Sequence, residues 1–180
     1  MQKKWGLVDK DLGYTDGCFI NDTGEIKYDF KNGIFAINSD KIKSICGYIG
    51  KAEIKAEMGK SGDIYAEIEN EKASITAISC DGNNIYDSKR ILLSVIGNCY
   101  NSDMVWDNKT LTHQGKGPTI IEKIKGKIYI ASNNKTCNAF ALDANGNRVE
   151  TLAVDKTENG FSVNIASKTD TIYYELSCSY

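Results

Sequence analysis

The stretch "NAFALDANGNRVETLAV", residues 138–154, decides the fold class. Apolar and polar residues alternate on both sides of a central Asn145-Gly146 pair. Alternation at every second residue is typical of a strand with one buried face, and Asn-Gly between two such runs is the strongest short-range hairpin signal. These residues therefore predict a β-hairpin that packs one face against a core.

The same period of two extends over most of the chain. It is found in residues 52–58, 63–71, 73–79, 119–132 and 161–177. Two of these segments, 119–132 and 161–177, are expected to be further hairpins, the first of which turns at Lys125-Gly126. No window of a dozen residues has the 3.6-residue period of a helix. We therefore expect an all-β fold with little or no helix, in which two antiparallel sheets pack face to face as a jelly-roll-like β-sandwich.

Length, composition and charge are those of an ordinary globular protein. With 180 residues, 41% of them hydrophobic and 26% charged, the chain is expected to be a single domain, residues 1–180, whose residues 1–18 form a less regular entry segment. The net charge is −2, and the dispersed Lys and Arg residues form no basic stripe for a nucleic acid. No apolar run reaches the length of a membrane span. We expect a monomer that binds neither nucleic acid nor membrane.

The cysteines and acidic loop residues give no metal motif. The six cysteines contain no Cys-x-x-Cys pair, which argues against a zinc site or a thioredoxin-like centre. Four of them lie in strand-like runs, where a thiol packs as a small apolar side chain, so free thiols are preferred over one or more disulfides. No cofactor is expected, and a structural calcium on loop aspartates remains an open alternative. These cysteines and aspartates are Cys18, Cys46, Cys80, Cys99, Cys137 and Cys178, and Asp9, Asp11, Asp16 and Asp22.

The acidic triplet Glu67, Glu69 and Glu71 has two interpretations. Residues at every second position share one face of a strand, and two carboxylates roughly 5 Å apart suit a retaining glycosidase. The apolar residues between and before them point to the opposite face, however, which places the glutamates on a solvated sheet surface. The solvated surface is the preferred interpretation, and a small β-sandwich glycosidase that uses the triplet is a remote alternative.

Rare residue types gather in residues 101–119, which hold Trp106, the only histidine and the only proline. His113 lacks a Gly-x-Ser-x-Gly nucleophile elsewhere in the chain, so we expect no nucleophilic catalysis and no enzyme activity. Aromatic rings with polar neighbours suit an amphipathic ligand such as a sugar. The candidate carbohydrate-binding residues are Tyr100, Asn101, Asp103, Trp106, Asp107 and His113. The alternative is that Trp106 is a core or edge residue that caps one end of the sandwich.

Several longer stretches carry a family resemblance. They are "NDTGEIKYD", "ITAISCDGNNIYDSKRILLSVIGNCYNSDMVW" and "GKGPTIIEKIKGKIYI", with Tyr174-Glu175 near the end. In these stretches the chain resembles the non-catalytic β-sandwich domain found toward the C-terminus of many large bacterial glycoside hydrolases, behind a (β/α)₈ catalytic barrel. The pattern maps to residues 21–29, 77–106, 115–122 and 174–175. Tyr28 stands in place of Trp, Cys80 in place of Leu, and Ser102-Asp103 in place of Thr-Gly.

The resemblance implies an ancillary module without catalytic residues of its own. It implies an extracellular location as part of a secreted or cell-surface enzyme, although the chain itself begins without a signal peptide. The partners would be a plant or microbial polysaccharide and the catalytic domain of the parent enzyme. The leading expectation is a module that binds polysaccharide through the aromatic and polar loop. The alternative is a purely structural domain that docks on the catalytic barrel.

Overall fold

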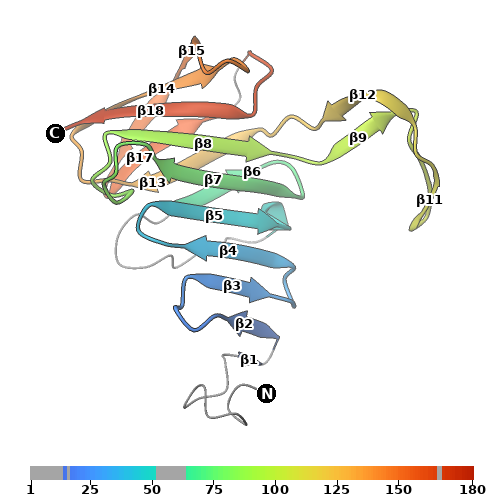
Figure 1. Ribbon diagram of the computed structural model, residues 1–180. Coiled ribbons are helices and arrows are strands. Elements are labelled where there is room, and N and C mark those ends of the chain that lie inside the picture. The colour runs from blue at the N-terminus through green and yellow to red at the C-terminus, as the bar shows by residue number, and fades with distance from the viewer. Residues whose placement is uncertain (1–13, 16, 52–63, 166–167) are drawn as a thin grey trace.

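The computed structural model describes residues 14–15, 17–51, 64–165 and 168–180. In these ranges the regular structure consists of β-strands and one 3₁₀ turn, η2 (Ile49–Lys51). A large and a small antiparallel sheet pack against each other, which confirms the predicted all-β sandwich (Figure 1). Within the same ranges, no helix has the length and apolar character that a membrane crossing requires.

The large sheet contains ten strands. In spatial order they are β1 (Tyr14–Thr15), β2 (Cys18–Ile20), β3 (Ile26–Asp29), β4 (Ile34–Asn38), β5 (Ile42–Gly47), β7 (Ala73–Ser79), β8 (Arg90–Ile96), β18 (Tyr173–Ser179), β14 (Thr136–Leu142) and β15 (Arg148–Leu152). Most neighbours in this order are also neighbours in sequence, whereas β18 lies between β8 and β14. The expected entry segment, residues 1–18, falls mostly outside the described residues, and its last part forms β1 and the start of β2.

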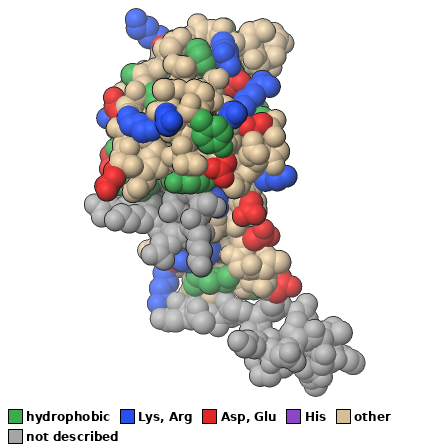
Figure 2. Space-filling view, turned by 90° about the vertical axis from the view of Figure 1, so that its left-hand side faces the viewer, with side chains coloured by type: hydrophobic (Ala, Val, Ile, Leu, Met, Phe, Trp, Pro, Cys, Tyr) green, Lys and Arg blue, Asp and Glu red, His purple; other side chains and the backbone are tan. Residues whose placement is uncertain are grey.

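The small sheet contains four strands and covers one part of the large sheet. Its spatial order is β16 (Val154–Thr157), β17 (Gly160–Asn164), β13 (Gly126–Ala131) and β6 (Ile64–Ile68). The strands β1 to β3 continue beyond the region that this sheet covers (Figure 1). On the face that Figure 2 shows, basic and acidic side chains are interspersed, in keeping with the net charge of −2.

The core lies between the two sheets, where the period of two places isoleucines on the inner faces. In β7, for example, Ile75 and Ala77 are fully buried, as the alternation in residues 73–79 predicts. They share one apolar cluster with Leu93 of β8 and with Ile128 and Val163 of the small sheet. Each fully buried side chain of this kind stabilises the fold by roughly 1.5–3 kcal/mol, so this cluster holds the two sheets together.

The predicted hairpins have different outcomes. β14 and β15 form the hairpin at Asn145-Gly146, where the Gly146 amide donates to the Asp143 carbonyl at 3.0 Å. The hairpins predicted over residues 119–132 and 161–177 are wrong. Residues 126–131 join the small sheet instead of pairing with residues 119–121, and β17 and β18 belong to different sheets. Residues 52–58 lie outside the described part of the chain.

A polar contact holds the segment before Gly126. The side chain of Asn70 donates to the Lys123 carbonyl at 3.1 Å and accepts from the Lys125 amide at 3.0 Å. These bonds tie the segment between β12 and β13 to the residues that follow β6. Strand periodicity is a local property, whereas the choice of partner depends on such contacts between distant residues.

The preference for free thiols is wrong for one pair of cysteines. Cys137 of β14 and Cys178 of β18 form a disulfide, while Cys18, Cys46, Cys80 and Cys99 are free. The two bonded cysteines are 41 residues apart in sequence and face each other in the register of the two strands. The register between β14 and β18 brings the two cysteines together, and their spacing along the sequence does not reveal this pairing.

Candidate functional site

The stretch that holds the predicted site residues forms a projecting arm, residues 99–121. Its base is the strand pair β9 (Cys99–Ser102) and β12 (Lys116–Ile121), and its tip is the pair β10 (Val105–Asp107) and β11 (Thr110–His113). In the described part of the chain, neither pair is hydrogen-bonded into the two sheets of the sandwich. Figure 1 shows the arm extending away from the end of the sandwich. The arm follows β8 in the chain and precedes β13.

The arm exposes large apolar side chains. Trp106 is 53% exposed and Ile120 is 55% exposed, and Tyr100, Val105 and Ile121 are also exposed. Trp106 therefore does not cap the core of the sandwich, and its indole faces solvent. Every residue of β10 and β12 is exposed, in contrast to central strands of the sandwich such as β7 and β8, in which alternate residues are buried.

Two of the predicted polar ligands bind the arm's own backbone. The Asn101 side chain donates to the Gln114 carbonyl at 3.1 Å, and its oxygen accepts from the Thr119 hydroxyl at 3.2 Å. His113 Nδ1 lies 3.0 Å from the Asp103 carbonyl and 3.0 Å from the Gly115 amide. A protonated Nδ1 donates to the carbonyl and an unprotonated one accepts from the amide, so either tautomer fastens the neck of the tip hairpin.

The remaining predicted residues are spread over the two strand pairs. Tyr100 is opposite Ile120 in the base, whereas Trp106 is opposite Leu111 in the tip. Among the ring contacts of the described residues, Tyr100 and Trp106 do not form a pair. Asp103 is exposed and adopts a left-handed backbone conformation with φ of 62°, and the exposed carboxylate of Asp107 accepts from the Asn108 side chain at 3.2 Å. The six residues share the arm but do not form one two-ring platform.

The sequence did not reveal a cavity of about 440 Å³ beside the base of the arm. Three segments line it, together with Val95: residues 121–124 from the last residue of β12 onward, residues 142–144 from the last residue of β14 into the turn, and residues 170–174 before and at the start of β18. Each segment is predicted separately as a strand end or a turn. Because they are far apart in sequence, only the fold brings them together.

The polar groups of the cavity are held in place. The Glu122 carboxylate accepts from the side chains of Asn70 and Asn98, each at 2.8 Å. The hydrogen bonds from Asn70 and then from Asn98 hold the pKa of Glu122 below its ordinary value, although burial opposes this. Lys123 and Asp170 form an ion pair of 3.0 Å between two of the lining segments. Glu122 is therefore a fixed anion and not a proton donor at neutral pH.

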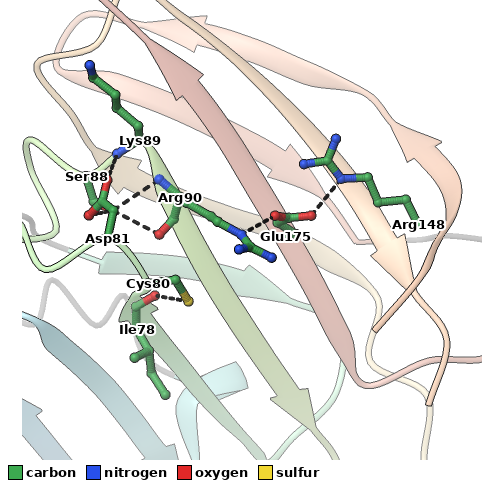
Figure 3. Close-up of polar contacts among 8 residues, drawn as sticks. All are labelled: Ile78, Cys80, Asp81, Ser88, Lys89, Arg90, Arg148 and Glu175. Carbon is green, nitrogen blue, oxygen red and sulfur yellow. Dashed lines mark hydrogen bonds and ion pairs between the residues drawn. The ribbon is translucent and has the colours of Figure 1, made fainter. Parts of the chain in front are cut away.

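Residues at recurring positions of the resemblance serve the architecture, as Figure 3 shows. Asp81 accepts from the Ser88 hydroxyl at 3.0 Å and from the Lys89 amide at 2.6 Å, and so closes the loop before β8. Burial raises the pKa of Asp81, but the hydrogen bonds from Lys89, Ser79 and their neighbours outweigh it and lower this pKa overall. The carboxylate stays ionised as a structural anchor.

Glu175 of β18 lies between two arginines in the same view (Figure 3). Arg90 of β8 and Arg148 of β15 each donate through Nε to one of its carboxylate oxygens at 2.7 Å. Arg148 reaches across β14, where its guanidinium lies 4.2 Å from the centre of the Phe140 ring. The bond from Arg148, and then that from Arg90, lowers the pKa of the buried Glu175. These contacts join three strands of the large sheet.

The acidic triplet does not form a pair of carboxylates on one strand face. β6 ends at Ile68, so Glu69 and Glu71 lie beyond the strand that carries Glu67. All three are exposed, as the preferred interpretation predicts. Glu67 accepts hydrogen bonds from the hydroxyls of Tyr65 at 3.0 Å and Tyr129 at 3.1 Å. The prediction that the triplet shares one strand face is therefore wrong, because the strand is shorter than its alternating pattern.

Within the described ranges, no cluster of three or more His, Cys, Asp or Glu side chains has a metal-binding arrangement. Of the four aspartates that were open to a structural calcium, Asp9, Asp11 and Asp16 lie outside the described residues. Asp22 is exposed and accepts from the Thr23 amide at 3.0 Å. No protein-family model matches the chain, and no curated protein or solved structure matches it.

Proposed function

We propose that the chain is a non-catalytic accessory module of a polysaccharide-degrading enzyme and that its arm docks on the neighbouring catalytic domain. The observation that carries this proposal is the exposed apolar surface of the arm. Tyr100 and Ile120 face each other on one side of the β9–β12 pair, and Ile121, the next residue along the strand, is on the other side. An isolated two-stranded ribbon is marginally stable in water, so a partner that covers these side chains would stabilise it.

The chemistry of the arm suits a protein surface. Trp106 and Tyr100 are of the residue types that most often dominate the binding energy of protein interfaces. The amide of Asn101 and Nδ1 of His113 are bonded within the arm, whereas its large apolar side chains are exposed. That the partner is a catalytic barrel of a glycoside hydrolase rests on the resemblance of residues 77–106 and 115–122 to the accessory domain of such enzymes.

The ionised state of two cavity carboxylates, Glu122 and Asp143, supports a module without catalytic activity. A glycosidase needs a carboxylic acid with a raised pKa to protonate the leaving group. The hydrogen bonds from Asn70 lower the pKa of Glu122, and those from Asn147 lower the pKa of Asp143. Both carboxylates are therefore ionised at neutral pH and unsuited to act as general acid.

Polysaccharide binding by the tip of the arm is the second candidate function. The observation that favours it is the exposed indole of Trp106 at the tip of the arm. An exposed ring can stack on the apolar face of a sugar. Docking and sugar binding would both use the indole of Trp106. A variant of an aliphatic residue of the arm, Ile120, is therefore needed to distinguish them.

The test measures docking and sugar binding with the same variants. Isothermal titration calorimetry of the chain against the (β/α)₈ domain encoded in the same gene or operon is expected to detect binding that Trp106→Ala and Ile120→Ala each weaken at least tenfold. Val149→Ala, which removes an equally exposed apolar residue from β15, is expected to leave the affinity unchanged. Absence of binding, or an equal loss in Val149→Ala, would refute docking.

Affinity electrophoresis in xylan, mannan, β-glucan, galactan and cellulose derivatives tests the second candidate. If the tip binds sugar, Trp106→Ala loses the retardation, whereas Ile120→Ala keeps it because an aliphatic side chain on the base does not stack on a sugar ring. If the wild type migrates equally in all gels, the arm does not bind these polysaccharides.

A further inference from the structure

We propose that the cavity beside the base of the arm is a binding site for a sugar unit that is neutral or carries an amino group. Its volume of about 440 Å³ lies within the range of small-molecule sites, which is roughly 300–1,000 Å³. This site shares only Ile121 with the arm. It goes beyond the proposed docking function and does not depend on it.

The walls of the cavity are largely apolar. Val95, Ile124, Leu142 and Tyr174 are buried residues that line it, and the exposed Tyr173 is also among its lining residues. Apolar walls with an aromatic ring favour a ligand that has an apolar face. A hydrated inorganic ion would leave these apolar walls in contact with water. An organic ligand with an apolar face therefore fits the cavity better than an inorganic ion.

The charges of the cavity select against anions. Among the described residues that line it are three carboxylates, those of Glu122, Asp143 and Asp170, against one ammonium, that of Lys123. With Glu122 and Asp143 held ionised, the lining has a net charge of −2 at neutral pH. Each of these carboxylates already accepts bonds within the protein, and its remaining lone pairs can only accept, so the ligand that complements them carries several hydrogen-bond donors. An apolar face and several hydroxyl donors together describe a pyranose, and a uronic acid is disfavoured by like-charge repulsion.

The site is formed in advance of binding. Thr171 donates its hydroxyl to the Leu142 carbonyl at 2.5 Å, and the hydroxyl of the buried Tyr174 donates to the Thr171 carbonyl at 3.3 Å. The β14–β15 turn is fixed by Asp143, which accepts from the Asn145 and Asn147 amides at 2.8 and 2.9 Å. A ligand therefore does not have to order these segments, which reduces the entropic cost of binding.

The test is a titration of the ¹⁵N-labelled full chain, followed by NMR, with cellobiose, xylobiose, mannobiose, galactobiose, glucosamine and glucuronic acid. At least one neutral disaccharide or glucosamine is expected to shift the amide signals of residues 121–124, 142–144 and 170–174. Glucuronic acid is expected to bind at least tenfold more weakly at low salt, and Asp170→Asn is expected to narrow that difference. The proposal is refuted if none of the neutral or amino sugars shifts these signals, or if glucuronic acid binds as tightly as they do.

Two variants and two controls locate the binding. Ala144→Trp, a substitution at an exposed turn position, fills the opening and is expected to abolish the shifts, and Tyr173→Ala is expected to weaken binding several-fold. Tyr180→Ala removes an exposed tyrosine elsewhere, and Trp106→Ala removes the exposed indole of the arm; both are expected to bind like the wild type. Loss of sugar binding in Trp106→Ala with retention in Ala144→Trp would place the sugar on the arm and overturn the proposal. Failure of docking leaves the expected shifts unchanged, so the two proposals fail separately.

Discussion

The sandwich and the arm use the same kinds of side chain in opposite ways. Ile128 in β13 is fully buried between the sheets, whereas Ile120 in β12, eight residues earlier, is 55% exposed. Both lie in antiparallel strands and have a paired residue on the neighbouring strand. The difference is that β13 has a second sheet opposite its inner face, and the described residues place no such layer over β12. Burial in a β-protein is thus decided by the second layer and not by the strand.

The largest expected effect on stability comes from truncating an isoleucine of the sandwich, which is compared with the same truncation in the arm. Ile128→Ala is expected to lower the free energy of unfolding by about 2–5 kcal/mol, because it removes buried apolar contacts and leaves a cavity. Ile120→Ala is expected to change it by less than about 0.5 kcal/mol, as for an exposed residue. Urea denaturation measures both. A comparable loss in Ile120→Ala would mean that the arm packs against the sandwich, and the contrast would fail.

A smaller effect is expected from the ionic contacts of the large sheet. Glu175→Gln is expected to cost about 1–3 kcal/mol at neutral pH, because it removes the charge from two bonds that a buried group makes to arginines. The matched change in the arm, Asp107→Asn, alters an exposed carboxylate and is expected to have almost no effect on the free energy of unfolding.

The pH dependence follows from the lowered pKa of Glu175. A carboxyl whose pKa is lower in the folded than in the unfolded state contributes its full stability above the ordinary value of 4.5 and loses it as the pH falls through the folded-state pKa. The difference in stability between the wild type and Glu175→Gln is therefore expected to shrink on acidification. If urea denaturation at several pH values gave a constant difference, the carboxylate would not be the group responsible.

The smallest effect is expected at the neck of the arm. His113→Ala removes the imidazole that lies 3.0 Å from the Gly115 amide, so hydrogen exchange of that amide is expected to accelerate several-fold. The free energy of global unfolding is expected to change by less than about 0.5 kcal/mol, because the opening is local. The amide of Ile128 is the internal control and is expected to keep its protection. A parallel loss of protection at Ile128 would show that arm and sandwich unfold as one unit.

The sequence predicts single strands better than it predicts their partners. The alternation in residues 73–79 and the Asn145-Gly146 turn are local, and both appear in the structure as predicted. The pairing of β12 with β9, and the disulfide between Cys137 and Cys178, depend on register between distant segments. A pattern along one strand contains no information about that register when several strands have the same pattern.

The candidate site was predicted in part, for the same reason. Rare residue types in residues 101–119 indicated an unusual segment, but they left open whether Trp106 faces solvent or the core, and the structure shows it exposed. That Asn101 and His113 are bonded to the arm's own backbone depends on how the chain folds back at residues 114 and 115. The cavity was missed because its three lining segments look like ordinary strand ends and turns when taken one at a time.

The position of β18 has a consequence for how the protein folds during synthesis. This strand lies between β8 and β14, and it is the one that hydrogen-bonds the large-sheet strands β1 to β5, β7 and β8 to the β14–β15 hairpin. A ribosome delivers β18 after all the strands that it joins. Up to that moment the large sheet consists of two separate pieces with open edges, which are prone to pair with other chains. Arg90 and Arg148, on the two pieces, then meet one carboxylate that arrives between them.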